Sequence, residues 1–165
     1  MNWMKKRWAV LVASVVTNIC IGTGFAWSVY QTGLFNESVS VFGTEVSQAQ
    51  LALAFTICSG VAPIPMIAGS GLQKTLRGPR NVVWLGGILF SAGLIATSFI
   101  HSLSMLYVTY GLLAGFGIAF AYGITIGNTV KFFPDKSGLS AGISTPAYGA
   151  GSIISPPIMQ ALIRR

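Results

Sequence analysis

Five long stretches without a charged side chain limit this sequence to very few folds. They cover residues 8–34, 48–72, 82–100, 105–130 and 139–163, and none contains Asp, Glu, Lys, Arg or His. A helix needs about 20 mainly apolar residues to cross the hydrocarbon of a bilayer. A membrane-spanning strand would alternate apolar and polar residues over about ten positions, and these stretches do not alternate. We therefore expect an all-α integral membrane protein with about five transmembrane helices.

The remaining composition fits a lipid-covered protein. Only 8% of the 165 residues are charged, whereas a soluble domain carries about a quarter. The net charge of +7 raises the possibility of nucleic-acid binding, but the basic residues form short clusters between apolar stretches rather than one basic face. The lipid bilayer is the expected partner, and nucleic acid is not. Cys20 and Cys58 lie inside apolar stretches, which favours small core residues over a disulfide framework.

The basic residues also predict an orientation. Alternating spans place most of them on one side of the membrane, namely Lys5, Lys6, Arg7, Lys74, Arg77, Arg80, Lys131 and Lys136. The positive-inside rule makes that side cytoplasmic, so we expect a multi-pass protein of the cell (inner) membrane with a cytoplasmic N-terminus. Arg164 and Arg165 are the exceptions on the outer side. The start resembles a signal peptide, but its apolar stretch continues to Leu34, which favours an uncleaved first span.

Local patterns add detail to these spans. Ser47 and Gln50 have the spacing of a capping box at the start of the second span. Prolines inside the second and fifth spans predict kinks, which membrane helices tolerate. The fourth span carries a small residue at every fourth position, at Gly111, Gly115, Ala119, Gly123 and Gly127. Residues four apart share a helix face, and such a stripe predicts close packing against another helix.

Two loops carry a family resemblance. Residues 71–80, Gly-Leu-Gln-Lys-Thr-Leu-Arg-Gly-Pro-Arg, resemble the signature loop of the major facilitator superfamily, which reads roughly G-x-x-x-D-R/K-x-G-R/P-R/K. Residues 131–142 resemble that superfamily's stretch between spans four and five. Together with residues 25–30, Phe-Ala-Trp-Ser-Val-Tyr, they are similar to the oxalate/formate antiporter family.

The resemblance implies the N-terminal half of a major facilitator fold. It implies transport of a small organic anion, such as oxalate or formate, by alternating access. It also implies a gating role for the loop motif at Gly71, Gly78, Pro79 and Arg80. Where the family has Asp in this loop, the sequence has Lys74 or Thr75. The superfamily has about twelve spans in two halves, so five spans indicate a truncated carrier whose C-terminal half is a missing partner.

Four residues are the candidates for lining a substrate cavity. Tyr122 and Tyr148 are the best positional matches to the aromatic residues of oxalate carriers, which this chain resembles. Trp27 and Gln31 share a helix face in the first span. Interfacial anchoring is the alternative explanation for such aromatic residues. Because the spans carry no charge, a carboxylate substrate would need its cations from the second half.

Two other functions remain in consideration. The chain could be a complete small membrane protein that acts by assembling with another membrane chain through the fourth-span stripe. A membrane enzyme has no support, because no nucleophile–base pair, metal cluster or phosphate loop is evident. We therefore expect no catalytic residues, no metal and no cofactor, and His101 is interpreted as an ordinary surface residue.

Overall fold

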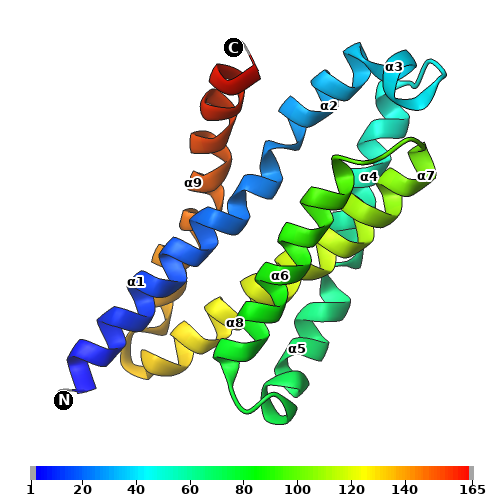
Figure 1. Ribbon diagram of the computed structural model, residues 1–165. Helices are drawn as coiled ribbons and strands as arrows, with labels where there is room; N and C mark the ends of the chain where they lie inside the picture. Colours follow the sequence, from blue (N-terminus) through cyan, green and yellow to red (C-terminus); the bar gives the residue numbers. More distant parts are fainter. Residues whose placement is uncertain (1–2, 164–165) are drawn as a thin grey trace.

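The computed structural model describes residues 3–163 and shows a bundle of long helices (Figure 1). No strand occurs among these residues. In chain order the elements are α1 (Trp3–Gly22), η1 (Thr23–Ala26), α2 (Trp27–Asn36), α3 (Ser38–Phe42), α4 (Gln48–Val61), α5 (Pro63–Thr75), α6 (Pro79–Thr97), α7 (Leu103–Leu106), the π-helical η2 (Tyr107–Ala114), α8 (Gly115–Phe132), η3 (Pro134–Lys136) and α9 (Ser137–Ile163). The prediction of an all-α membrane protein is confirmed.

Four segments of the described chain are long and apolar enough to cross a membrane. They are Lys6–Asn36, Gln48–Thr75, Pro79–Thr97 and Leu103–Phe132, which match the first four predicted spans within a few residues. The fifth predicted span is the single helix α9, which is 27 residues long and uncharged. Its Ser, Gly and Pro residues lower its hydropathy, and it is not among the four. Its crossing of the membrane stays a prediction.

Local sequence explains where several helices begin and break. The predicted capping box is present at α4, where Ser47 and Gln50 exchange side-chain and backbone hydrogen bonds. The second span breaks at Ala62, directly before Pro63, because proline cannot donate to the preceding turn. Pro79 begins α6 at a position where its missing N–H costs nothing. Helix α9, in contrast, continues through Pro146, Pro156 and Pro157.

Glycines bring two pairs of helices into close contact. Helix α6 packs along η2 and α8, and α1 packs along α9. A Cβ added to Gly86 would lie 2.8 Å from the Gly117 carbonyl oxygen, and one added to Gly93 would lie 2.7 Å from the Ala114 nitrogen. Gly22 of α1 faces the backbone carbonyl of Tyr148 in the same way. Helix α6 therefore covers one side of η2 and α8, and α9 covers one side of α1.

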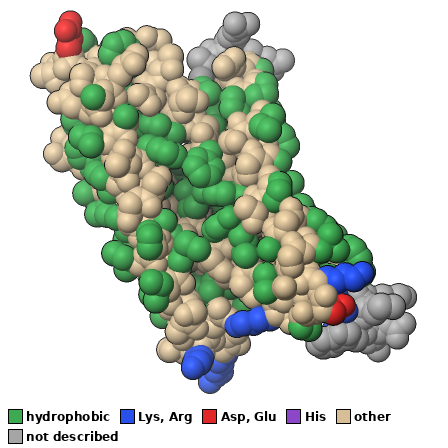
Figure 2. All heavy atoms as spheres, turned by 180° about the vertical axis from the view of Figure 1, so that it is seen from behind, with side chains coloured by type: hydrophobic (Ala, Val, Ile, Leu, Met, Phe, Trp, Pro, Cys, Tyr) green, Lys and Arg blue, Asp and Glu red, His purple; other side chains and the backbone are tan. Residues whose placement is uncertain are grey.

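The charged side chains gather at the two ends of the bundle. Lys and Arg lie at the end where α1, α6 and α9 begin, and acidic side chains mark the opposite end (Figures 1 and 2). One carboxylate breaks this pattern, because Asp135 forms an ion pair with Arg7 at the basic end. Arg164 and Arg165, the two predicted exceptions to the positive-inside rule, lie outside the described residues, as does the side chain of Lys5.

Candidate functional site

A small apolar pocket lies between the first, second, fourth and fifth predicted spans. Its volume is about 200 Å³. It is lined by Gly24, Phe25, Phe55, Cys58, Ser59, Ala62, Met66, Gly115, Ile118, Ala119, Tyr122 and Tyr148. Helix α6 contributes no lining residue, since it closes another face of α8. The pocket is thus formed by four of the five predicted spans.

Tyr122 and Tyr148 form the centre of an aromatic cluster on one wall of this pocket. Their ring centroids are 4.7 Å apart, with an angle of 39° between the planes. Phe25 lies 4.7 Å from Tyr148 and 5.7 Å from Phe55, measured between ring centroids. Both tyrosines are half-buried. Aromatic edges and hydroxyls so placed can hold a small planar molecule and offer it hydrogen bonds.

The other two candidates lie apart from this cluster. Trp27 is buried against Tyr110, with 4.2 Å between ring centroids, and its indole N–H has no hydrogen-bond partner among the described residues. Gln31 donates to the Gln48 carbonyl oxygen at 3.1 Å. Neither residue lines the pocket. The structure therefore brings Tyr122 and Tyr148 together and places Trp27 and Gln31 in contacts between spans.

The sequence reasoning did not connect Phe25, Phe55 and Cys58 with a pocket. Phe25 and Phe55 complete the aromatic cluster, and Cys58 lies beside Gly115 at the contact between α4 and α8. Phe25 and Phe55 belong to different spans, so no spacing pattern in the sequence links them. The prediction of two core cysteines holds for Cys58, which is buried, and is wrong for Cys20, which is exposed on α1. Lipid contact makes an exposed thiol acceptable in a spanning helix.

The signature loop forms a tight turn between α5 and α6. Arg77 and Gly78 both have positive φ angles, of 59° and 139°, and the Gly78 N–H donates to the Gln73 carbonyl at 2.9 Å. The Asn81 amide donates to the Leu76 carbonyl at 2.6 Å. Glycine at position 78 removes the steric cost of this φ angle. Of the other motif residues, Pro79 begins α6, Arg80 is exposed beside it, and Gly71 is exposed on α5.

The small residues of the fourth span face the hairpin of α4 and α5 over most of their length. A Cβ on Gly111 would lie 2.9 Å from Ile57 Cγ2, one on Gly115 would lie 3.1 Å from Cys58 Cα, and one on Gly123 would lie 3.2 Å from Met66 Cγ. Ala119 is 2% exposed. Gly127 differs, since no described atom lies within 4 Å of its added Cβ.

A buried polar network ties α1, α8 and α9 together. The Asn18 amide donates to the Ser144 carbonyl at 2.9 Å and accepts from the Thr125 hydroxyl at 2.8 Å. Ser14 and Thr129 share a hydrogen bond of 2.6 Å. Asn18 and Thr129 are completely buried. Such bonds hold helices in register where no water competes for them.

Comparison with known proteins identifies the family. The chain is 31% identical over 153 residues to YhjX, an uncharacterized MFS-type transporter of Escherichia coli (strain K12). It is 30% identical over 159 residues to the oxalate:formate antiporter of Oxalobacter formigenes and 30% identical over 164 residues to human monocarboxylate transporter 12. These alignments cover 92%, 96% and 96% of the chain, respectively.

The chain is much shorter than these relatives. It spans 36%, 36% and 30% of their respective lengths, a share that fits the N-terminal part of such a transporter. No protein-family model matches the chain. The signature loop, the helical membrane architecture and these relatives agree with one another, and the chain therefore belongs to the major facilitator superfamily of membrane transporters.

Proposed function

We propose that this chain is part of a carrier that moves a small organic anion across the cell (inner) membrane by alternating access. The observation that carries this proposal is the aromatic pocket, in which Tyr122 and Tyr148 face each other at 4.7 Å between α8 and α9. A carrier in which one half rocks against the other binds its substrate between the two halves. In this proposal the chain moves a solute and performs no chemical step, so it is not an enzyme.

The names of the relatives support a carboxylate as the substrate. One is an oxalate:formate antiporter and several are monocarboxylate transporters. A pocket of about 200 Å³ has room for an anion of that size. The tyrosine hydroxyls can donate hydrogen bonds to carboxylate oxygens, while the aromatic walls exclude water. Oxalate or formate is therefore the substrate that we propose.

The charges of the chain define what the partner must supply. No residue lining the pocket is a cation, and an unpaired carboxylate is costly to bring into a low-dielectric site. We propose that the C-terminal half of the transporter faces this pocket and provides the countercharge. The loop of Gly71, Gly78, Pro79 and Arg80 would then lie on the cytoplasmic side, where it contributes to gating.

Complementation with part of a relative tests this function. Cells would express the chain together with the oxalate:formate antiporter polypeptide from which the matching third has been removed, and uptake of labelled oxalate would be measured. Saturable uptake is expected, and Tyr122→Ala should reduce it by roughly tenfold because an aromatic contact is lost. Phe99→Ala, at an aromatic residue 67% exposed outside the pocket, is the matched control.

The proposal is wrong if uptake does not exceed that of cells with the relative's part alone. Uptake that survives Tyr122→Ala and Tyr148→Ala would exclude the aromatic pocket as the site. An expressed and inserted chain that binds membrane proteins but never supports uptake would favour the alternative function in assembly.

A further inference from the structure

One end of the aromatic pocket points to the acidic end of the bundle, and two phenylalanines lie there. Helix α4 runs from the acidic end towards the basic end (Figure 1), so Phe55 is its lining residue nearest the acidic end. Span one runs in the opposite direction, and Phe25 is its last lining residue. Tyr122 is the last lining residue of α8, which runs to the basic end. The two phenylalanines therefore lie between Tyr122 and the acidic end.

The four aromatic rings of the pocket form a continuous series in which Phe25 is the central link. Its ring centroid lies 5.7 Å from that of Phe55 and 4.7 Å from that of Tyr148. The planes are tilted by 56° and 60°, a geometry in which aromatic rings attract each other. Tyr148 in turn contacts Tyr122. The Phe25 ring thus joins the second span to the fifth, and its removal would open the space between them.

The break in span one presents the Phe25 side chain to the pocket. Within η1 the residues on either side of Phe25 are buried, whereas Phe25 is 42% exposed. The Gly24 carbonyl accepts a hydrogen bond of 2.6 Å from the Tyr110 hydroxyl, and Trp27 is buried against the same tyrosine. The backbone around Phe25 is therefore held in place, while its exposed ring can change rotamer on a fast timescale.

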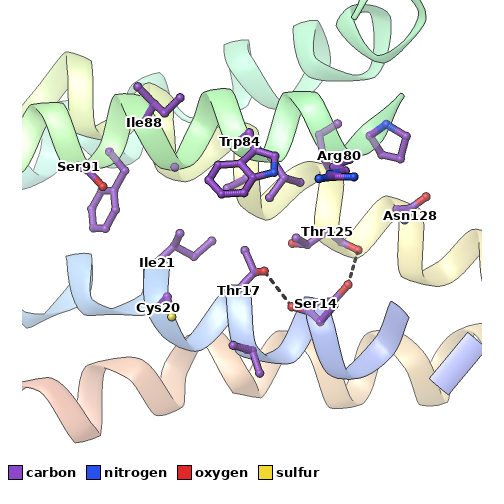
Figure 3. A pocket seen from close by; sticks show the side chains of 18 of the residues that line it. Ser14, Thr17, Cys20, Ile21, Arg80, Trp84, Ile88, Ser91, Thr125 and Asn128 are labelled. Carbon is purple, nitrogen blue, oxygen red and sulfur yellow. Dashed lines mark hydrogen bonds between the residues drawn. The ribbon is translucent and has the colours of Figure 1, made fainter. Parts of the chain in front are cut away.

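The part of span one that precedes the break is fixed to the other helices. The Ser14 hydroxyl of α1 donates to the Thr125 carbonyl of α8 at 3.5 Å, a bond that Figure 3 shows between the two helices. Asn18, one turn further along, bonds to α8 and α9. Phe25 follows Asn18 by about 10 Å along the helix at 1.5 Å per residue. Its ring is thus mounted on a firm support and can move without moving the helix.

From these contacts we propose that Phe25 and Phe55 form a gate at the acidic end of the aromatic pocket. The two rings contact each other in the structure, which is the closed arrangement, since a narrow opening lined by apolar groups excludes water and ions. Rotation of the Phe25 ring away from Phe55 opens a path to Tyr122 and Tyr148. This inference rests on the proposed function, because a gate matters only where the pocket takes up a solute.

The thiol of Cys58 reports directly on access to the pocket. Cys58 lines the pocket and is buried, and a thiol reacts as its thiolate, which forms less readily in an apolar site. Cys20 would be replaced by Ser. A charged, membrane-impermeant methanethiosulfonate would be applied at the acidic end, which is the outside of intact cells in the predicted orientation. Phe25→Ala and Phe55→Ala should each raise the rate of Cys58 modification about tenfold, because the ring contact is lost.

Matched variants separate a gate from a general loosening of the bundle. Phe35→Ala changes the same residue type in the same span, at a side chain 39% exposed and outside the pocket, and should leave the rate unchanged. Phe25→Leu retains most of the apolar bulk and should keep the rate within about twofold of the parent. In inside-out vesicles the reagent reaches the basic end, where Phe25→Ala should have no effect.

The test requires no transport, so its failure is distinct from failure of the proposed function, which the uptake measurement decides. Unchanged rates in both Phe25→Ala and Phe55→Ala would overturn the gate. A rate raised equally from the two sides, or raised as much by Phe35→Ala, would mean that the substitutions loosen the bundle. If Cys58 stays unmodified in every variant but reacts after unfolding, something other than these two rings closes the pocket and the gate is likewise excluded.

Discussion

Asn18 shows how a single polar residue can organise a membrane bundle. It is completely buried in an apolar span and bonds to α8 and α9 at the same time. In lipid an amide without partners is costly, so its two bonds favour one relative placement of three helices. The sequence contained a signal for this network, because Ser14 and Asn18, and Thr125 and Thr129, are each four residues apart and share a helix face.

Asp135 is the residue whose charge state should affect stability. A hydrogen bond with its own backbone amide and the nearby Arg7 guanidinium hold the pKa of this carboxyl below its usual value. Arg7 also lies over the Phe133 ring, 4.5 Å from its centroid. Because the folded-state pKa is depressed, the stabilisation is present above about pH 4 and is lost as pH falls through the folded-state value. Asp135→Asn should therefore lower Tm near pH 7.

Thermal unfolding of the chain in detergent between pH 3 and pH 7 measures this effect. The difference in Tm between wild type and Asp135→Asn should shrink as the pH falls. Glu45→Asn, which removes a carboxylate from the opposite end of the bundle, should show no such convergence. A Tm difference independent of pH would contradict the role assigned to the ion pair.

At the scale of elements, α8 packs closely against α4 at one glycine and leaves open space at another. Gly115 faces Cys58 of α4, while Gly127, on the same helix, faces open space. Gly115→Leu should therefore force α4 and α8 apart and reduce the yield of folded, inserted protein. Gly127→Leu should be tolerated, and it gains up to about 1 kcal/mol of helix propensity. The measurement is the monodisperse fraction after detergent extraction, and equal yields would show that α8 does not depend on this contact.

The positions of the helices and the break before Pro63 were predictable from the sequence, but the break in the first span was not. Spans of 19 or more residues without charge can only be buried in lipid or protein, which fixed the helices within a few residues. The break at Thr23–Ala26 depends on tertiary contacts, since Gly22 meets the Tyr148 carbonyl and the Tyr110 hydroxyl donates to the Gly24 carbonyl at 2.6 Å. No local pattern encodes these partners, which lie far along the chain.

Only some residues of the candidate site were predictable from the sequence. Tyr122 and Tyr148 were found through a resemblance to carriers, and the structure places them in one pocket. Trp27 and Gln31 share a helix face with Gly24, but the 3-10 turn between α1 and α2 changes the direction of that face. Phe25 and Phe55 could be recognised only from the assembled bundle.

The whole molecule has a basic and an acidic end, which predicts its orientation in the membrane. Single cysteines would be placed at Val39, which is 60% exposed near the acidic end, and at Thr75, which is exposed at the basic end. The background lacks Cys20 and Cys58. An impermeant thiol reagent added to intact cells should label the first cysteine and spare the second, because basic loops remain cytoplasmic. The reverse labelling pattern would mean an inverted orientation.

The largest-scale prediction is that residues 1–165 alone do not perform coupled transport. Alternating access requires two halves that rock around a central site, and this chain spans about a third of its relatives. The aromatic pocket contains no cation, so an anion entering it would lose its hydration without gaining a countercharge. The purified chain would be reconstituted in liposomes, and uptake of labelled oxalate and formate would be compared with empty vesicles.

Uptake at the level of empty vesicles is the expected result. Self-association could in principle bring two copies of the pocket face to face, but both surfaces would then lack a cation and would not hold a carboxylate. Saturable uptake that unlabelled substrate inhibits and Tyr122→Ala abolishes would therefore reverse the conclusion. It would mean that the aromatic pocket binds anions through hydroxyl and edge contacts alone, and that these five helices form a working carrier.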